Sequence, residues 1–285
     1  KSGYHLENIK DEELEWNTTA EFKALANLNP KVLIIDRLST ELEWMTDLAS
    51  KLQYIVTMDD VGEGSFFADL AINSILFDFP NNDGRPQGYD YLVLKPIKQK
   101  PIPSRSDKVN LIVASFGGHD YRNLTGFFLS VVSKKEYNFK KNQLIDVLVG
   151  AESKILINEW KAQVDKISLQ DGPKVRLIVR PDDFIERLAR ADLAVLSGGL
   201  TIFDAVSLGV PAIGLPQYQH QLATLQNLDK HGVLYLGSNG MDLDTEYFGE
   251  VYSNLLYAGA ERFTVSQKGS NLIDRKGIDR VISMI

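Results

Sequence analysis

The stretch SGGLTIFDAVSLGVPAIGLP, residues 197–216, decides the fold. The apolar run LAVLS at 193–197 predicts a buried strand, and the glycine pair that follows predicts a turn. The next segment, TIFDAVSLG, has the pattern of a helix, and a second apolar run at 211–216 ends in proline. A strand, a turn, a helix and a second strand in this order predict a βαβ unit of a parallel sheet.

The same alternation fills most of the chain. Strands are expected at 32–36, 54–60, 68–74, 109–116, 144–150, 175–179, 193–197 and 211–216. Helices are expected at 18–28, 40–51, 122–133, 152–166, 182–190, 200–208 and 219–231, and the last 40 residues are predicted to be mainly helical. This pattern favours an α/β fold with two Rossmann-like lobes and parallel sheets around a cleft. We expect a truncated N-terminal lobe at 1–95, a proline-rich linker at 96–108 and a larger C-terminal lobe at 109–285.

Composition excludes several classes of protein. A chain of 285 residues is long enough for two domains, and the absence of cysteine excludes disulfide scaffolds, thiol catalysis and Cys-ligated zinc. The net charge of −7 and the lack of a basic stripe argue against nucleic acid as a partner. The four histidines lack the spacing of metal ligands, so no metal and no cofactor are expected. No secretory signal or membrane-length apolar run is seen, which predicts a cytoplasmic protein.

Two glycine pairs follow predicted strands of the second lobe, at Gly117–Gly118 and at Gly198–Gly199. Ligands of open α/β sheets bind at the carboxyl ends of the strands, and the free amides of a helix N-terminus suit phosphate. Asp204 lies one helical turn beyond Thr201, where its carboxylate could accept both hydroxyls of a ribose. The alternatives are a plain turn in which Thr201 caps the helix, and a solvated Asp204.

Polar side chains gather after the strand expected at 211–216. Five amide side chains and one histidine occupy this segment: Gln217, Gln219, His220, Gln221, Gln226 and Asn227. Uncharged donors and acceptors suit sugar hydroxyls. A polar loop that leads into a polar helix is the alternative.

Four residues are candidates for acid or base catalysis. His119 is the one histidine in a glycine-rich loop, where it could bind phosphate or transfer a proton near neutral pH. Asp36, Asp59 and Asp60 end strands of the first lobe, where they could act as bases or could cap the helices that follow.

Four segments together resemble a known superfamily. They are ASFGGHDYRNLT (114–125), RLARADLAVLSGGLTIFDAVSLGVPAIGLP (187–216), QHQ (219–221) and LIDRKGIDRV (272–281). These segments resemble the GT-B nucleotide-sugar proteins. The resemblance is strongest to the UDP-sugar hydrolase group of the pseudaminic acid pathway and to spore coat polysaccharide biosynthesis proteins. The peptidoglycan UDP-GlcNAc transferase is a more distant relative.

The resemblance implies a GT-B fold that binds UDP or a UDP-sugar in the second lobe. Gly198, Gly199 and Thr201 would meet the diphosphate, with Ser197 and Leu200 beside them, and Asp204 would bind the ribose. Gln221 would meet the sugar together with Gln219 and His220, while Gly117, Gly118 and Asn123 would line the cleft.

Two hypotheses of function follow. The first is a hydrolase or glycosyltransferase of surface polysaccharide or nonulosonic acid biosynthesis, with His119, Asp36 or Asp60 as its acid or base. The second is a non-catalytic protein that holds a nucleotide sugar or a partner enzyme of the same pathway. It arises because the histidine loop of the hydrolase group has no counterpart in residues 1–30, and Leu38 stands near the position of a tyrosine in that group. An NAD-dependent oxidoreductase is disfavoured because no G-x-G-x-x-G follows a predicted strand.

Overall fold

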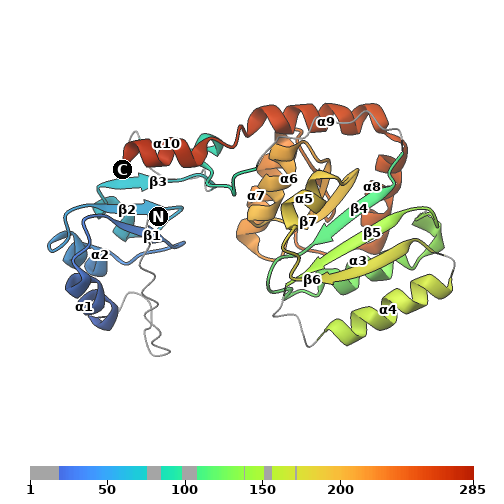
Figure 1. Cartoon of the computed structure of the whole chain (residues 1–285), viewed down its shortest axis with the longest axis horizontal. Coiled ribbons are helices and arrows are strands. Elements are labelled where there is room, and N and C mark those ends of the chain that lie inside the picture. The colour runs from blue at the N-terminus through green and yellow to red at the C-terminus, as the bar shows by residue number, and fades with distance from the viewer. Residues whose placement is uncertain (1–18, 76–84, 98–107, 138, 151–155, 171) are drawn as a thin grey trace. The chain divides into compact units, whose positions relative to one another are not determined.

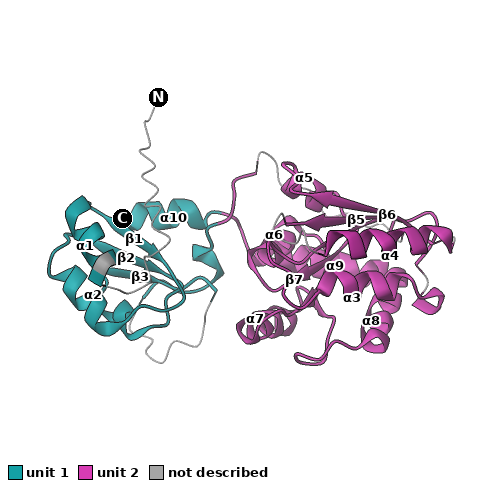
Figure 2. Cartoon of the chain, turned by 90° about the horizontal axis from the view of Figure 1, so that it is seen from below, with its two compact units in different colours: residues 1–93, 276–285 teal, residues 94–275 magenta. Residues whose placement is uncertain are grey.

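The computed structural model describes residues 19–75, 85–97, 108–137, 139–150, 156–170 and 172–285 (Figure 1). The chain divides into two compact units (Figure 2): unit 1 comprises 1–93 with 276–285, and unit 2 comprises 94–275. Most of the segment expected as a linker, residues 98–107, lies outside the described residues.

The C-terminal helix α10 (Gly277–Met284) differs from the expectation, which placed it in the second lobe. Val281 of α10 packs against Val56 and Ile72 in the core of unit 1. An apolar helix face can be buried against either lobe, so the sequence pattern alone does not assign this helix. The chain therefore passes between the two units twice, after Val93 and after Arg275.

Unit 1 holds a parallel sheet of three strands, β1 (Leu33–Asp36), β2 (Ile55–Met58) and β3 (Leu70–Ile72), in that order. Helices α1 (Thr19–Leu28) and α2 (Leu42–Ala49) and two short 3₁₀ helices, η1 (Glu63–Phe67) and η2 (Tyr89–Tyr91), complete its described part. Met45 and Leu48 of α2 pack with Ile55 of β2 in a small apolar core.

Unit 2 contains a parallel sheet of six strands in the order β6–β5–β4–β7–β8–β9. The strands are β4 (Leu111–Ser115), β5 (Leu144–Val149), β6 (Lys174–Val179), β7 (Leu193–Ser197), β8 (Ala212–Leu215) and β9 (Tyr235–Leu236). The first five confirm predicted strands, and the short β9 was not predicted. The strand order reverses between β4 and β7, and such a switch point is where ligands bind in doubly wound sheets. Both glycine pairs follow these two strands.

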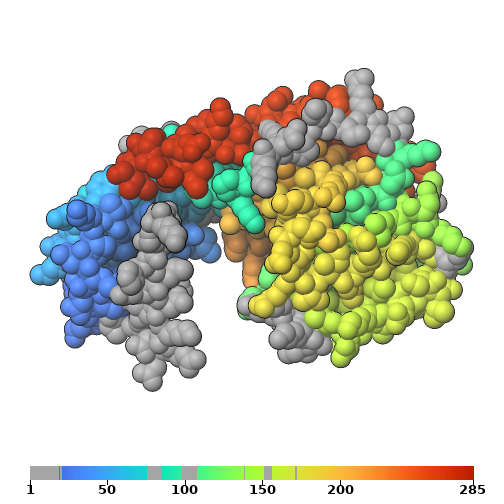
Figure 3. Space-filling model, viewed as in Figure 1, coloured from blue at the N-terminus to red at the C-terminus, as the bar shows by residue number. Residues whose placement is uncertain are grey.

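The helices of unit 2 form two packing groups. Helix α3 (Leu124–Val132) packs against α4 (Ile157–Leu169) and α8 (Thr245–Tyr257), while α6 (Leu200–Leu208) packs against α5 (Phe184–Ala189) and α9 (Gly259–Leu272). Helix α7 (Gln219–Lys230) and the short η3 (Lys135–Tyr137) complete the set. Helices α4 and α9 lie on the surface of unit 2 (Figure 3). Within the described residues, no helix is long and apolar enough to cross a membrane.

Candidate functional site

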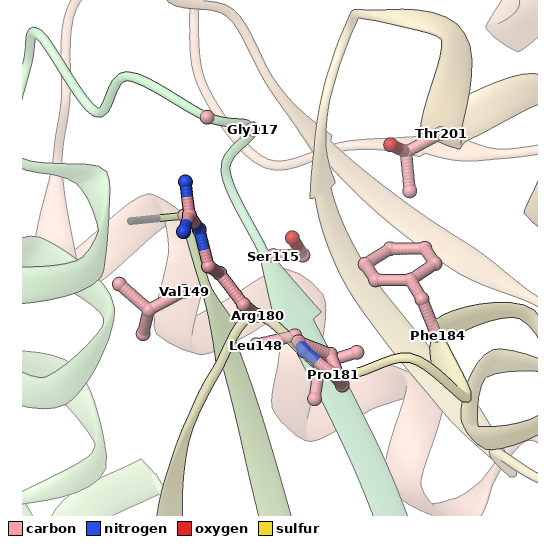
Figure 4. A pocket seen from close by; sticks show the side chains of 10 residues that line it. Ser115, Gly117, Leu148, Val149, Arg180, Pro181, Phe184 and Thr201 are labelled. Atoms are coloured by element: carbon pink, nitrogen blue, oxygen red, sulfur yellow. The ribbon is translucent and has the colours of Figure 1, made fainter. Parts of the chain in front are cut away.

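A cavity of about 310 Å³ lies at the carboxyl ends of β4, β5 and β6 and beside the first turn of α6 (Figure 4). It is lined by Ser115, Gly117, Gly118, Leu148, Val149, Gly150, Arg180, Pro181, Phe184 and Thr201. Of the predicted site residues, Gly117, Gly118 and Thr201 therefore meet at one cavity, as expected for loops that share one edge of a parallel sheet.

The two glycines after β4 have different reasons to be glycine. Gly117 has a φ of +84°, in the left-handed region that favours glycine. Gly118 has no such φ, and a Cβ atom added to it would meet no atom within 4 Å. The fold therefore requires glycine at 117 and leaves open space beside 118.

Of the two glycines after β7, the fold again requires only one to be glycine. A Cβ atom on Gly198 would lie 2.8 Å from the carbonyl oxygen of Gln221 and 3.0 Å from Cγ of Leu225, so helix α7 packs directly on this backbone. A Cβ atom on Gly199 would meet only Nε2 of Gln221, at 3.8 Å. Close packing explains Gly198, and no contact of the fold explains Gly199.

The first turn of α6 carries no side-chain cap. Gly199 is the N-cap residue and Leu200 begins the helix, so Thr201 lies inside the first turn and does not cap it. The alternative in which Thr201 caps a plain turn is therefore wrong. The amide of Ile202 donates to the carbonyl oxygen of Gly199 at 3.1 Å, while those of Leu200 and Thr201 can donate to an acceptor from outside the helix, and the helix dipole adds a partial positive charge there.

Seven of the ten cavity residues were not predicted from the sequence, and three of them, Gly150, Arg180 and Phe184, shape the site. Gly150 follows β5, and a Cβ atom on it would lie 2.6 Å from Cα of Gly118, so the two loops touch backbone to backbone. Arg180 follows β6 with a φ of +49°, and its side chain points toward Gly117, while the ring of Phe184 points toward Thr201 (Figure 4). All strands of a parallel sheet end at the same edge. The residues that follow the strands predicted at 144–150 and 175–179 were therefore also candidates for the site, and the sequence analysis did not consider them.

The strands that carry the cavity loops are held by a buried carboxylate. Asp146 of β5 accepts hydrogen bonds from Arg176 of β6 at 2.6 and 2.7 Å and from Arg187 of α5 at 3.2 Å. Its side chain is 3% exposed. This network fixes β5, β6 and α5, and thereby the wall formed by Arg180 and Phe184.

Arg122 and Gln217 tie the loop after β4 to the loop after β8. Nη1 of Arg122 donates to the carbonyl oxygen of Pro216 at 2.7 Å, and Nη2 donates to that of Met241. Gln217 donates through Nε2 to the carbonyl oxygen of Phe116, while its buried Oε1 has no hydrogen-bond partner in the described part of the chain. A buried acceptor thus lies without a partner at this edge of the sheet.

The QHQ segment opens helix α7. Gln221 is buried, and its Oε1 accepts a hydrogen bond from the backbone amide of Gln217 at 3.0 Å. Its Nε2 lies beside Gly199. Gln219 and His220 are exposed, and the His220 ring stacks on Tyr218. Only Gln221 of the three therefore contacts the glycine turn.

His119 and Asn123 lie on the loop between β4 and α3. His119 is exposed and stacks on Tyr121, with ring centroids 5.5 Å apart. Oδ1 of Asn123 accepts hydrogen bonds from the amide of Gly126 and from Nε1 of Trp160, so this side chain caps α3 and anchors α4. Neither residue lines the cavity, and the contacts of Asn123 are structural.

The carboxylate of Asp204 is already paired within unit 2. Nη1 of Arg275 donates to Oδ1 of Asp204 at 2.9 Å, and the two side chains are 6% and 13% exposed. Burial raises the pKa of Asp204, while the charges of Arg275 and Lys95 oppose that rise. The alternative of a solvated Asp204 is therefore wrong, because the side chain is mostly buried in an ion pair.

The carboxylates of unit 1 have distinct environments. Asp60 is fully buried and accepts hydrogen bonds from the amides of Thr40 and Gly62 and from the hydroxyl of Thr40, which is the role of a loop anchor. Asp59 accepts from the amides of Ser74 and Ile75, and burial raises its pKa. Asp36 is exposed at the end of β1. Of these three, Asp36 is open to solvent as a proton acceptor, and Asp60 is not.

In the described residues, no three His, Asp or Glu side chains are grouped so that they could hold a metal ion.

Two proteins similar in sequence align with most of this chain. The spore coat polysaccharide biosynthesis protein SpsG of Bacillus subtilis is 24% identical over 266 residues, which is 89% of this chain and 76% of SpsG. An uncharacterized protein of Methanocaldococcus jannaschii is 25% identical over 90% of this chain and 54% of its own length, so the chain spans about half of that relative. No family model matches the sequence.

Solved structures share the fold at lower identity. MurG of Acinetobacter baumannii superposes with a TM-score of 0.67 at 13% identity, over 93% of this chain and 76% of MurG. S. aureus MnaA with UDP gives 0.63 at 12% identity, over 93% and 77%. The rhamnosyltransferase SpnG with thymidine diphosphate gives 0.57 at 18% identity, over 93% and 76%. The chain therefore has the GT-B fold and is similar in sequence to SpsG.

Proposed function

We propose that unit 2 binds a pyrimidine nucleoside diphosphate sugar, with a UDP-sugar as the ligand class. The observation that carries this proposal is the pair Gly118 and Gly199. Neither has a φ in the left-handed region or a close neighbour that demands glycine. Both lie at the switch point of the sheet, one beside the cavity and one at the N-cap of α6. Glycine at such positions allows a ligand to approach the backbone closely.

The parts of the ligand fit different parts of this edge. The base is proposed to occupy the cavity between the Arg180 and Phe184 side chains, because an aromatic ring stacks on a base and an arginine supplies hydrogen-bond donors. The diphosphate is proposed to lie on the amides of Leu200 and Thr201, which no side chain caps. The sugar would then extend toward Gln221, whose amide nitrogen lies beside Gly199.

A pyrimidine diphosphate is supported by two structural neighbours. MnaA is in complex with UDP, and SpnG is in complex with thymidine diphosphate. We take UDP-sugars as the ligand class. Thymidine diphosphate sugars are the alternative, and measured affinities for UDP and thymidine diphosphate distinguish the two.

The reaction proposed is cleavage at the anomeric carbon, by glycosyl transfer or by hydrolysis, in polysaccharide or nonulosonic acid biosynthesis. The amides at the α6 N-terminus would stabilise the diphosphate as it departs. His119, on the exposed part of the β4–α3 loop, is the proposed proton-transfer group of unit 2, and Asp36 that of unit 1. The similarity to SpsG supports the biosynthetic role.

Calorimetric titration of the chain with UDP, thymidine diphosphate, UMP, uridine and ADP tests the proposal. UDP is expected to bind more tightly than UMP or uridine, because they lack the diphosphate, and ADP tests the choice of a pyrimidine over a purine base. Equal affinity for UDP and uridine would remove the diphosphate site from α6. Release of free UDP from a panel of UDP-sugars, with and without acceptor sugars, then separates hydrolysis from transfer and both from binding without turnover.

A further inference from the structure

Arg275 occupies an unfavourable backbone conformation. Its φ is +64°, in the left-handed region that is unfavourable for a residue with a side chain and costs glycine little. An arginine at such a position is expected only where its side chain does something that a glycine cannot do. The side chain is 6% exposed, so this action takes place inside unit 2.

The guanidinium of Arg275 joins three parts of unit 2. Nη1 donates to Oδ1 of Asp204 at 2.9 Å and to Oγ of Ser207 at 2.7 Å, both on helix α6. Nη2 donates to the carbonyl oxygen of Lys95. Lys95 lies just after the chain enters unit 2, and Arg275 is the last residue before the chain leaves it. The guanidinium thus fastens both crossing segments to the helix whose N-terminus faces the cavity.

The pairing leaves half of the Asp204 carboxylate open. Among the described residues, only Oδ1 is hydrogen-bonded, and a carboxylate accepts up to about four hydrogen bonds. Asp204 lies three residues after Thr201, which lines the cavity, so the two share one face of α6. A carboxylate held through one oxygen by a fixed guanidinium presents its second oxygen in one orientation.

We propose that Arg275 is a positioning residue for ligand binding: it orients the Asp204 carboxylate on α6 toward a ribose and fastens that helix to the crossing segment at Lys95. This inference rests on the proposed function, because it names a second layer of the same nucleotide site. Arg275 is 6% exposed and does not line the cavity, and its two Nη atoms donate to Asp204, Ser207 and Lys95, so it acts through Asp204.

The test measures UDP affinity from pH 4.5 to 8 for the wild-type chain, Arg275→Gly, Asp204→Asn and the double variant. Glycine suits the backbone at 275, so Arg275→Gly removes the guanidinium while relieving the strain. Its UDP affinity at pH 7.5 is expected to fall about tenfold, the scale of one charge-assisted hydrogen bond. In the Asp204→Asn background, the same change is expected to leave affinity unaltered, because Arg275 acts through that carboxylate.

The pH profile separates positioning from mere support of the fold. Among the described residues, the charged groups that act on the Asp204 carboxylate are Arg275 and Lys95, while the Ser207 hydroxyl accepts from the same guanidinium and donates to the backbone carbonyl oxygen of Asp204. Loss of Arg275 removes a charge that lowers the pKa of Asp204, so the acid-side loss of UDP affinity is expected to move to higher pH. Ser207→Ala is the matched control, since it removes another hydrogen bond of the same guanidinium and should leave the pH profile in place.

Each outcome decides the proposal. Wild-type affinity and an unshifted pH profile in Arg275→Gly would overturn the inference while the proposed function stands. A wild-type chain that binds no nucleotide would overturn the proposed function and this inference with it. If Arg275→Gly does not fold, Arg275→Lys keeps the charge without the planar fork. It is then expected to show weakened affinity with a smaller pH shift, and wild-type behaviour of that variant would contradict the proposal.

Discussion

Gly198 and Gln221 are in such close contact that a Cβ atom on Gly198 would lie 2.8 Å from the carbonyl oxygen of Gln221. One residue further along, a Cβ atom on Gly199 would meet only Nε2 of Gln221, at 3.8 Å. Adjacent glycines therefore serve different purposes: one lets helix α7 pack on the turn after β7, and the other leaves space at the N-terminus of α6.

The first prediction contrasts these two glycines. Gly198→Ala should lower the free energy of unfolding by about 1–3 kcal/mol, because the added methyl overpacks a rigid backbone contact. Gly199→Ala should cost less than about 1 kcal/mol, the scale of a poorer N-cap residue, and should weaken UDP binding. Urea unfolding and calorimetry measure the two effects. A Gly199→Ala variant with wild-type UDP affinity would show that no ligand approaches this backbone.

The second prediction concerns the loop after β4. Gly118→Ala should fold with wild-type stability, because the added Cβ atom meets no neighbour within 4 Å, and should bind UDP more weakly, because the methyl intrudes beside the cavity. Gly117→Ala is the matched control at the next position. Its φ of +84° makes alanine unfavourable by about 1–2 kcal/mol. A destabilised Gly118→Ala variant would mean that the loop, rather than a ligand, requires this glycine.

The third prediction concerns the cavity wall. Phe184→Ala should weaken UDP binding by about 1–3 kcal/mol, the usual worth of an aromatic side chain stacked on a base. Tyr257→Ala is a suitable control, because Tyr257 is 67% exposed at the end of α8 and does not line the cavity. Calorimetry on both variants, with thermal unfolding to confirm the fold, gives the comparison. Equal losses in the two variants would exclude a specific role for Phe184.

The fourth prediction concerns how the stability of unit 1 depends on pH. Burial raises the pKa of Asp59 above its ordinary 3.8. The folded state therefore favours the protonated carboxyl. The protonated Asp59 carboxyl therefore contributes its full share to the free energy of unfolding below pH 3.8. This contribution is lost as the pH rises through the raised pKa. Asp59→Asn should remove this loss while keeping the bonds from Ser74 and Ile75 to Oδ1. Asparagine also tolerates the φ of +52° at this residue.

Hydrogen exchange of the β2 and β3 amides between pH 4 and 7 measures this dependence. The wild-type protection of these amides should decline with rising pH, after correction for intrinsic exchange, more steeply than that of Asp59→Asn. Parallel profiles for the two chains would show that Asp59 does not control the stability of unit 1 in this range.

The strands and helices of unit 2 were largely predictable, because buried parallel strands are continuous apolar runs and the helices between them are amphipathic. The glycine pairs were predictable as site candidates, because they follow predicted strands and parallel strands end at one edge of the sheet. The partner of Asp204 was not predictable: Arg275 lies 71 positions further along the chain, and only the tertiary fold brings it to α6.

The sequence alone also does not indicate which glycine of a pair is required by the fold. That distinction depends on φ at Gly117 and on the packing of Leu225 against Gly198, both of which arise from tertiary contacts. Asp204→Ala would leave the buried Arg275 guanidinium without its carboxylate, so Asp204→Asn is the better variant.

A crystal structure of the chain with UDP tests the central claim most directly. The account predicts the uracil in the cavity between Arg180 and Phe184 and the diphosphate within hydrogen-bond distance of the amides of Leu200 and Thr201. It also predicts a ribose hydroxyl on Oδ2 of Asp204. UDP bound away from the β4 and β7 loops, or no UDP bound in crystals soaked at millimolar concentration with these loops free of lattice contacts, would contradict it.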